Sequence, residues 1–168
     1  MKEYRQHKYE VPEGATEIIL VRHGESRAAT ADSPFPLVGG QGDPELAPQG
    51  RQQAVAVGER LKHFPINAVY VTSLQRTVET AAPLCAQLEM DHRVDPDLRE
   101  VHLGDWEGGK FRIMVHENHP LYVKMNEEQR WDVIPGAESK EALQERVGRG
   151  LHRIAQMHPN ELVVAVLH

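Results

Sequence analysis

The sequence has a single cysteine, Cys85, so no disulfide can form within the chain. A protein without disulfides needs no oxidising compartment, which predicts the reducing cytoplasm as its location. Long apolar runs are also absent, and no stretch approaches the roughly 20 apolar residues of a membrane-spanning helix. The first residues, MKEYRQHKYEVPEG, lack the apolar stretch of a secretory signal peptide. These absences predict a cytoplasmic protein with no membrane partner.

Positive charge is in short supply as well. The chain has 19 lysines and arginines against 25 aspartates and glutamates, and its formal net charge is −6 at pH 7. This balance argues against a nucleic-acid partner, which requires a basic surface. An anionic small-molecule substrate must then be bound by local cations rather than by the field of the whole protein.

The 168 residues, of which 40% are hydrophobic and 26% charged, are typical of one globular domain over 1–168 with a polar extension over 1–15. Buried strands are predicted over 17–21, 67–73 and 161–168, and helices over 48–64, from 72 to 90, within 107–127 and over 138–158. We expect 30–50 and 91–109 to be irregular. Strands that alternate with helices predict an α/β fold, a three-layer α/β/α sandwich with a mostly parallel sheet.

Two details of the second helix follow from its sequence. Thr72 and Gln75 have the spacing of a capping box, in which Thr72 caps the helix and Gln75 reaches back to it. Pro83 is expected to kink or interrupt the same helix.

Arginines and histidines occur where the predicted strands end. Arg22 and His23 complete the first strand, Arg76 lies just beyond the second, and His168 ends the third. The carboxyl ends of parallel strands share one edge of a sheet, where ligands bind in open α/β folds. Two guanidinium groups suit a doubly charged tetrahedral anion such as phosphate. We expect helix N-termini after RHGES and TSLQR to add backbone donors.

Two other interpretations compete with a phosphate site. Taken singly, each strand-end residue is typical of a solvated surface position. A metal site needs histidines or carboxylates around a cation, but Arg22 and Arg76 would repel that cation, so no metal is expected. His116 and His119 have a spacing that suits metal ligands, yet Pro120 follows them and favours the end of a surface helix.

Five segments, in this order, resemble those of the histidine phosphatase superfamily, also called the phosphoglycerate mutase-like family. The segments are LVRHGES (20–26), LAPQGRQQA (46–54), VTSLQRTVETA (71–81), LREVHLGDWEG (98–108) and VVAVLH (163–168). The segments are spread from residue 20 to residue 168, so the resemblance covers nearly the whole chain. The resemblance implies a phosphoglycerate mutase-like fold and phosphoryl chemistry without a cofactor.

The resemblance also implies a role for each site residue. His23 is the nucleophile that forms a phosphohistidine, and its other ring nitrogen is expected to be fixed by a backbone carbonyl. Arg22 and Arg76 bind the phosphoryl oxygens, and a protonated His168 is expected to add a third positive donor. Glu100 protonates the leaving oxygen and then activates water.

Further residues near these positions are less specific. Gly24 and Ser26 complete the expected phosphate-binding set, although Ser26 is equally suited to capping a following helix. Three more acidic residues lie close to Glu100 in the sequence and are alternative general acids, namely Asp97, Asp105 and Glu107. Candidate pocket-lining residues are Trp106, Arg112, Arg130 and Trp131.

The sequence departs from the family pattern in three places. Ala29 stands near the position where the family often carries a phosphate-binding asparagine, so one contact is missing or replaced. Loop 31–44 is longer than usual and is expected to form part of the substrate pocket or a lid. The family continues beyond the strand that ends in His168, so we expect the natural polypeptide to run on.

Three functions are compatible with these residues. The first is a phosphomonoesterase acting on small phosphate esters. The second is a phosphoglycerate mutase, which returns the phosphoryl group to a second hydroxyl; the compact segment between Glu100 and the last strand argues against it. The third, a non-catalytic phospholigand-binding module, is disfavoured because all five site residues are present. The oligomeric state is open, and a homodimer is one option.

Overall fold

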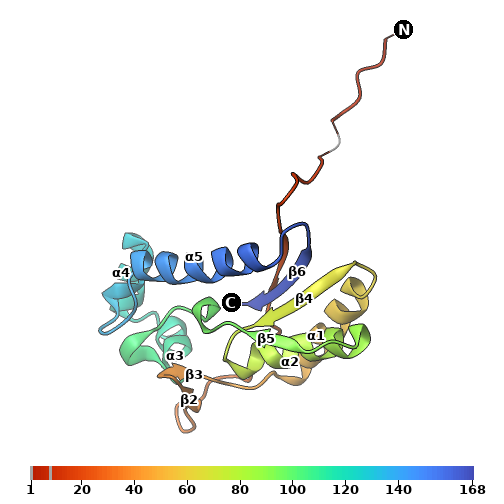
Figure 1. Cartoon of the computed structure of the whole chain (residues 1–168). Helices are drawn as coiled ribbons and strands as arrows, with labels where there is room; N and C mark the ends of the chain where they lie inside the picture. Colours follow the sequence, from red (N-terminus) through yellow and green to blue (C-terminus); the bar gives the residue numbers. More distant parts are fainter. Residues whose placement is uncertain (1, 8) are drawn as a thin grey trace.

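The computed structural model describes residues 2–7 and 9–168, and its centre is a four-stranded parallel sheet (Figure 1). The strand order is β1-β6-β4-β5, made of β1 (Glu17–Arg22), β6 (Leu162–Leu167), β4 (Ile66–Val71) and β5 (His92–Val94). Every pair in this sheet is parallel. The carboxyl ends of the strands therefore lie at one edge.

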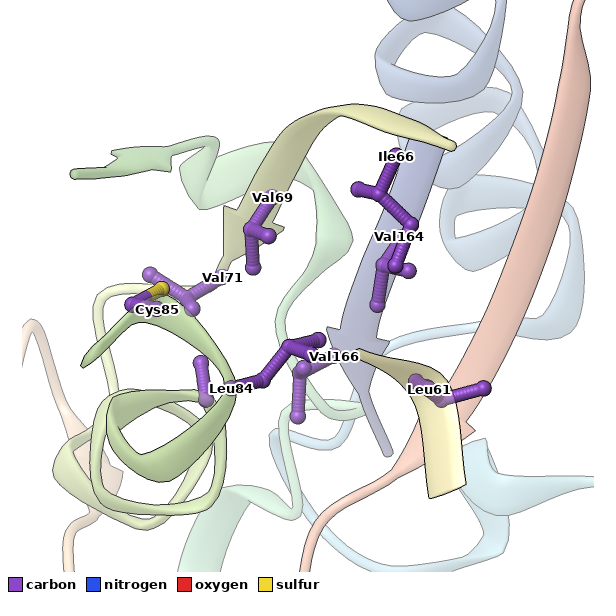
Figure 2. Close-up of a cluster of buried hydrophobic side chains, with 9 residues drawn as sticks. Leu61, Ile66, Val69, Val71, Leu84, Cys85, Val164 and Val166 are labelled. Carbon is purple, nitrogen blue, oxygen red and sulfur yellow. The ribbon is translucent and has the colours of Figure 1, made fainter. Parts of the chain in front are cut away.

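Helices cover both faces of the sheet. On one face, α1 (Pro48–Leu61) and α2 (Gln75–Leu88) contribute Leu61, Leu84 and Cys85 to a core with the valines of β4 and β6 (Figure 2). On the other face, Ile154 of α5 (Lys140–Met157) packs with alternate residues of the same strands. Strands buried on both faces are apolar throughout, as the sequence predicts. The three-layer α/β/α architecture is confirmed.

The remaining elements lie beside the carboxyl edge of the sheet. They are a hairpin of β2 (Leu37–Val38) and β3 (Gln41–Gly42), helices α3 (Lys110–His116) and α4 (Pro120–Glu128), and the 3₁₀ turns η1 (Pro96–Leu98), η2 (Gly104–Trp106) and η3 (Trp131–Val133). Of these, α3, α4, η2 and η3 pack around a separate small core of Trp106, Met125 and Ile134, whereas Leu98 of η1 packs with Ile154 of α5.

The helices and strands follow the sequence predictions closely, with exceptions that have physical causes. The region 91–109 contains β5, which is too short to give a recognisable alternation. The helix expected within 107–127 is two helices, separated at His119, whose side chain accepts a hydrogen bond from the Leu121 N–H and caps α4. α2 continues through Pro83 without interruption. None of the described helices has the length and apolar character to cross a bilayer.

Two predicted helix caps are wrong. Thr72 does not cap α2, whose N-cap is Leu74. The hydroxyl of Thr72 accepts a hydrogen bond from the Leu74 N–H at 3.2 Å, and Gln75 turns away to Asp43. No helix follows RHGES, since the next one begins only at Pro48, so Ser26 caps nothing.

Candidate active site

The sheet brings His23 and His168 together. Arg22 pairs with Leu167 in the register between β1 and β6, so the next residue of each strand is a histidine. The His23 N–H donates to the Leu167 carbonyl at 2.9 Å, and the two imidazole rings are 5.0 Å apart between centroids. The convergence predicted for the strand ends is therefore present for these two residues.

His23 is held in one orientation and is neutral. Its Nδ1 lies 2.7 Å from the Gly24 carbonyl oxygen, so Nδ1 carries the proton and Nε2 faces the site with a free lone pair. Burial lowers the pKa of His23 to about 4, and the charges of Arg76, Arg22 and Arg112 contribute to that shift. Such a ring can attack an electrophile at neutral pH.

Gly24 is a structural residue. Its N–H donates to the Thr80 hydroxyl at 3.0 Å and is therefore not free for phosphate, contrary to its expected role in phosphate binding. A Cβ at this position would lie 2.6 Å from the Gly50 carbonyl oxygen at the start of α1. Only glycine permits this close approach of two backbone segments.

Arg76 is a buried cation that faces the nucleophile. Its Nε lies 3.3 Å from Nε2 of His23, and its Nη1 donates to the Gly42 carbonyl at 3.0 Å. Burial lowers the pKa of Arg76, while the carboxylates of Glu100 and Asp43 oppose the shift. The guanidinium is thus fixed by the loop that contains Gly42 and points at the space over His23.

His168 is neutral in this site, so its expected positive charge is absent. Burial lowers the pKa of His168 to about 2, with Arg76 and His23 contributing. Its Nε2 lies 3.1 Å from the Thr72 hydroxyl, which explains why Thr72 is not a helix cap. Among the described residues, nothing bonds its buried Nδ1. His168 can therefore supply a neutral N–H donor, not a third cation.

Glu100 lines a cavity that lies over His23, and two side chains bind its backbone carbonyl. The Glu100 carbonyl accepts hydrogen bonds from Gln41 Nε2 at 2.6 Å and from Arg146 Nη2 at 3.1 Å. Arg146 also donates to the carbonyls of Asp97 and Arg99, and its ion pair with Glu138 has an N–O distance of 2.7 Å. Arg146 thus holds the backbone around Glu100, and no sequence pattern singles it out, because it occupies an ordinary polar position of α5.

The alternative acids have other partners. Glu107 accepts hydrogen bonds from the N–H groups of Gly42 and Leu103, both at 2.7 Å. Asp97 pairs with Arg153 at 2.9 Å, and Asp105 is exposed and does not line the cavity. Glu100 and Glu107 both line the cavity over His23, but both carboxylate oxygens of Glu107 accept hydrogen bonds, whereas in the described residues only Oε1 of Glu100 does, from the Val101 N–H at 3.0 Å. Glu100 is thus the one best placed to act on a ligand over His23.

A cavity of about 230 Å³ lies over His23 and is lined partly by aromatic rings. Trp106, Arg112 and Trp131 line it as predicted, whereas Arg130 does not, because it pairs with Asp132 at 2.7 Å. Loop 31–44 also contributes, as expected, with lining residues that the sequence did not single out: Phe35, Gln41, Gly42 and Pro44. The lining thus combines the charged groups around His23 with aromatic side chains.

Ser26 lies next to Arg112 of α3. Its hydroxyl accepts a hydrogen bond from Arg112 Nη2 at 2.6 Å, and Arg112 Nη1 donates to the Arg27 carbonyl at 2.8 Å. Arg112 lines the cavity over His23 and also a neighbouring one of about 740 Å³, which shares Arg22 and His23. The site therefore has a further guanidinium at its edge.

Known proteins resemble this chain over most of its length. Residues 18–168 match the model of the histidine phosphatase superfamily (branch 1). Phosphoglycerate mutase-like protein 4 of Arabidopsis thaliana is 40% identical over 158 residues, covering 90% of this chain and 66% of that protein. The metal-independent phosphoserine phosphatase of Arabidopsis thaliana is 34% identical over 157 residues, covering 91% of this chain and 64% of that protein.

Solved structures agree with the sequence comparison. A mycobacterial glucosyl-3-phosphoglycerate phosphatase superposes with a TM-score of 0.74 at 28% identity, over 92% of this chain and 74% of that one. The chain spans slightly less than two thirds of the length of the two plant relatives.

Proposed function

The chain belongs to the histidine phosphatase superfamily, and we propose that it hydrolyses small phosphate monoesters through a phosphohistidine formed on His23. The observation that carries this proposal is the contact between Arg76 and His23. A buried guanidinium Nε lies 3.3 Å from the free Nε2 of a neutral imidazole, which is a nucleophile facing an anion-binding group.

In the first step, the Nε2 lone pair of His23 attacks phosphorus and a P–N bond forms. The P–O bond to the ester oxygen breaks, and that oxygen takes the proton of a protonated Glu100, so the alcohol leaves neutral. Arg22 and Arg76 neutralise the non-bridging oxygens, and the free N–H of His168 donates to the developing charge.

In the second step, water attacks the phosphorus of the phosphohistidine. The Glu100 carboxylate takes one proton from that water, the P–N bond breaks, and its electron pair returns to Nε2 of His23. Orthophosphate leaves, and both His23 and Glu100 are restored. Since Glu100 works first as acid and then as base, its position over the reacting group must be kept through both steps.

Two features support chemistry without a metal. The arginines supply the charge that a divalent cation supplies in metallophosphatases, and a relative 34% identical to this chain is a metal-independent phosphoserine phosphatase. The alcohol moiety is proposed to lie against the aromatic side chains that line the cavity. A cytoplasmic location is part of the proposal, and a homodimer stays a prediction.

A phosphoglycerate mutase is the second candidate, and the observation that favours it is the 40% identity to phosphoglycerate mutase-like protein 4. Such an enzyme uses the same phosphohistidine but transfers the group to another hydroxyl. The distinguishing quantity is the acceptor of the phosphoryl group, which is water in a phosphatase.

The experiment combines a panel of phosphate esters, a mutase assay with phosphoglycerates, and trapping of the intermediate. Wild-type protein is expected to release orthophosphate and to carry acid-labile, base-stable phosphate after a quench, whereas His23→Ala has neither property. Label on another residue, or full turnover by His23→Ala, contradicts the mechanism. Phosphoryl transfer between phosphoglycerates without orthophosphate release favours the mutase.

A further inference from the structure

Arg112 is a cation without a carboxylate partner. No ion pair joins it to an acidic residue within 2–7 and 9–168, and the same is true of Arg22 and Arg76, the other two arginines that line the cavity over His23. Its two hydrogen bonds go to neutral acceptors, the Ser26 hydroxyl and the Arg27 carbonyl. Since a guanidinium has five N–H donors, three remain for a ligand.

The side chain is held in place rather than free. The Arg112 guanidinium lies 5.2 Å from the centroid of the Phe35 ring, which supports it from one side. The chain turns into α3 at Gly109, with a φ of 97°, and a Cβ there would lie 3.1 Å from Cβ of Ala29. Glycine at position 109 thus lets the start of α3 approach Ala29 closely.

Arg112 is close enough to His23, Arg76 and Arg22 for its charge to interact with theirs. Its charge helps to lower the pKa of His23 and of Arg76, and Arg22 in turn lowers the pKa of Arg112, after the larger effect of burial. Nearby carboxylates, among them Glu100 and Glu25, partly offset the repulsion among the three guanidiniums, and an anion bound between them reduces it further. The cavity over His23, which all three line, is the place for that anion.

We propose that Arg112 is a third arginine of the phosphate site, which binds a non-bridging oxygen of the same phosphoryl group that His23 attacks. The proposal rests on the proposed function, since it names a further binding residue of that site. Arg112 lines both cavities that include Arg22 and His23, so its remaining N–H donors are available to an anion bound there. The ligand chemistry is that of a phosphate dianion.

The test measures the affinity for inorganic phosphate by calorimetry, which requires no turnover. Arg112→Met is expected to weaken phosphate binding by about 10- to 100-fold, the range for losing a hydrogen bond to a charged group. Arg112→Lys keeps the positive charge but lacks the two-pronged guanidinium, so its phosphate affinity is expected to lie between those of the wild type and Arg112→Met. The kcat/KM for 4-nitrophenyl phosphate should fall by the same factor as the affinity.

Arg27→Met is the matched control. The Arg27 guanidinium lies 5.1 Å from the same Phe35 ring, but it pairs with Glu45 and does not line either cavity. It is expected to leave phosphate binding unchanged, so any effect of Arg112→Met cannot come from the loss of ring packing. Thermal unfolding of each variant reports whether it folds. If Arg112→Met does not fold, the phosphate affinity of Arg112→Lys is used as the test instead.

Each outcome decides the proposal. Phosphate affinity within twofold of wild type in Arg112→Met, or an equal loss in Arg27→Met, overturns it. An effect confined to esters with an additional anionic group also overturns it, because Arg112 then binds that group. If wild-type protein binds phosphate in an Arg112-dependent way but hydrolyses no ester, the proposed function fails and this inference stands; no phosphate binding at all overturns both.

Discussion

Nε of Arg76 lies 3.3 Å from Nε2 of His23, so a charged donor already faces the nitrogen that is proposed to attack phosphorus. An incoming phosphoryl group must enter between these two atoms, and its anionic oxygens replace the hydrogen bond from Arg76 to a neutral ring by a stronger one between opposite charges. The charge of Arg76 also lowers the pKa of His23 and so keeps the ring unprotonated, which leads to a first prediction about pH.

The kcat/KM of the wild-type enzyme is expected to fall on the acid side with a midpoint near the His23 pKa of about 4. Below this pH the ring gains a proton on Nε2 and loses its lone pair. Arg76→Gln removes one of the charges that disfavour protonation, so its acid limb should move to higher pH. Rates measured from pH 3 to 8 check this, and an unmoved limb would contradict the role of Arg76.

Stability is expected to depend on pH for the same reason. His23 and His168 have folded-state pKa values of about 4 and about 2, below the unfolded value of 6.5. Between pH 6.5 and 4 the unfolded chain binds more protons, so the free energy of unfolding decreases as the pH falls, by up to about 1.4 kcal/mol per pH unit for each histidine.

Urea unfolding at several pH values measures this slope. His23→Asn is expected to reduce it, whereas substitution of an exposed histidine, His63→Asn, serves as the control and leaves it unchanged. An identical slope in all three proteins would mean that the carboxylates alone set the acid sensitivity.

Glu100→Gln tests the general acid. The amide keeps the shape of the side chain but has no proton to give, so the loss should be largest for esters of alkyl alcohols and much smaller for 4-nitrophenyl phosphate, whose leaving group needs no proton. Single-turnover formation of the phosphohistidine isolates this step. The exposed Asp105→Asn is the control, and equal slowing for both leaving groups would exclude Glu100 as the acid.

Arg146→Met tests whether Arg146 positions Glu100. It removes hydrogen bonds to three carbonyls and leaves Glu138 without its partner, so we expect a loss of about 3 kcal/mol in stability. The kcat for alkyl esters should fall with little change in phosphate affinity, because Arg146 acts through Glu100.

The control for that experiment lies on the same helix. Arg149→Met removes an exposed arginine that pairs with Glu145 and Asp97. It should change neither the stability nor the kcat for alkyl esters. If Arg146→Met lowered stability but left kcat unchanged, Arg146 would be a purely structural residue.

Removal of metal ions is expected to leave the activity intact. The arginines provide the electrostatic stabilisation, so exhaustive chelation followed by assay in chelator should give the untreated rate. A zinc-dependent phosphatase treated in parallel shows that chelation was complete. Lost activity that returns on adding zinc or magnesium would contradict the mechanism.

Local patterns in the sequence determined the fold class and half of the site. Apolar runs such as 161–168 identify buried strands, because strands covered on both faces need apolar side chains throughout. The run 17–21 also forms a strand, but β1 lies at the edge of the sheet and leaves Leu20 exposed, so its predicted burial is wrong. Once the sheet is parallel, the residues that end its strands must share an edge, so the sequence predicts His23 and His168 at that edge, whereas their contact depends on the strand order that places β6 beside β1. The family resemblance supplied the expected roles.

Only the tertiary structure decided the rest of the site. The backbone of Glu100 is held by Gln41 and Arg146, which come from distant segments. The partner of Ser26 is Arg112, 86 residues away, and the charge of His168 depends on burial. These contacts have no periodicity along the chain, because they arise where loops and helix ends pack together, and neither burial nor partners can be read from a short window.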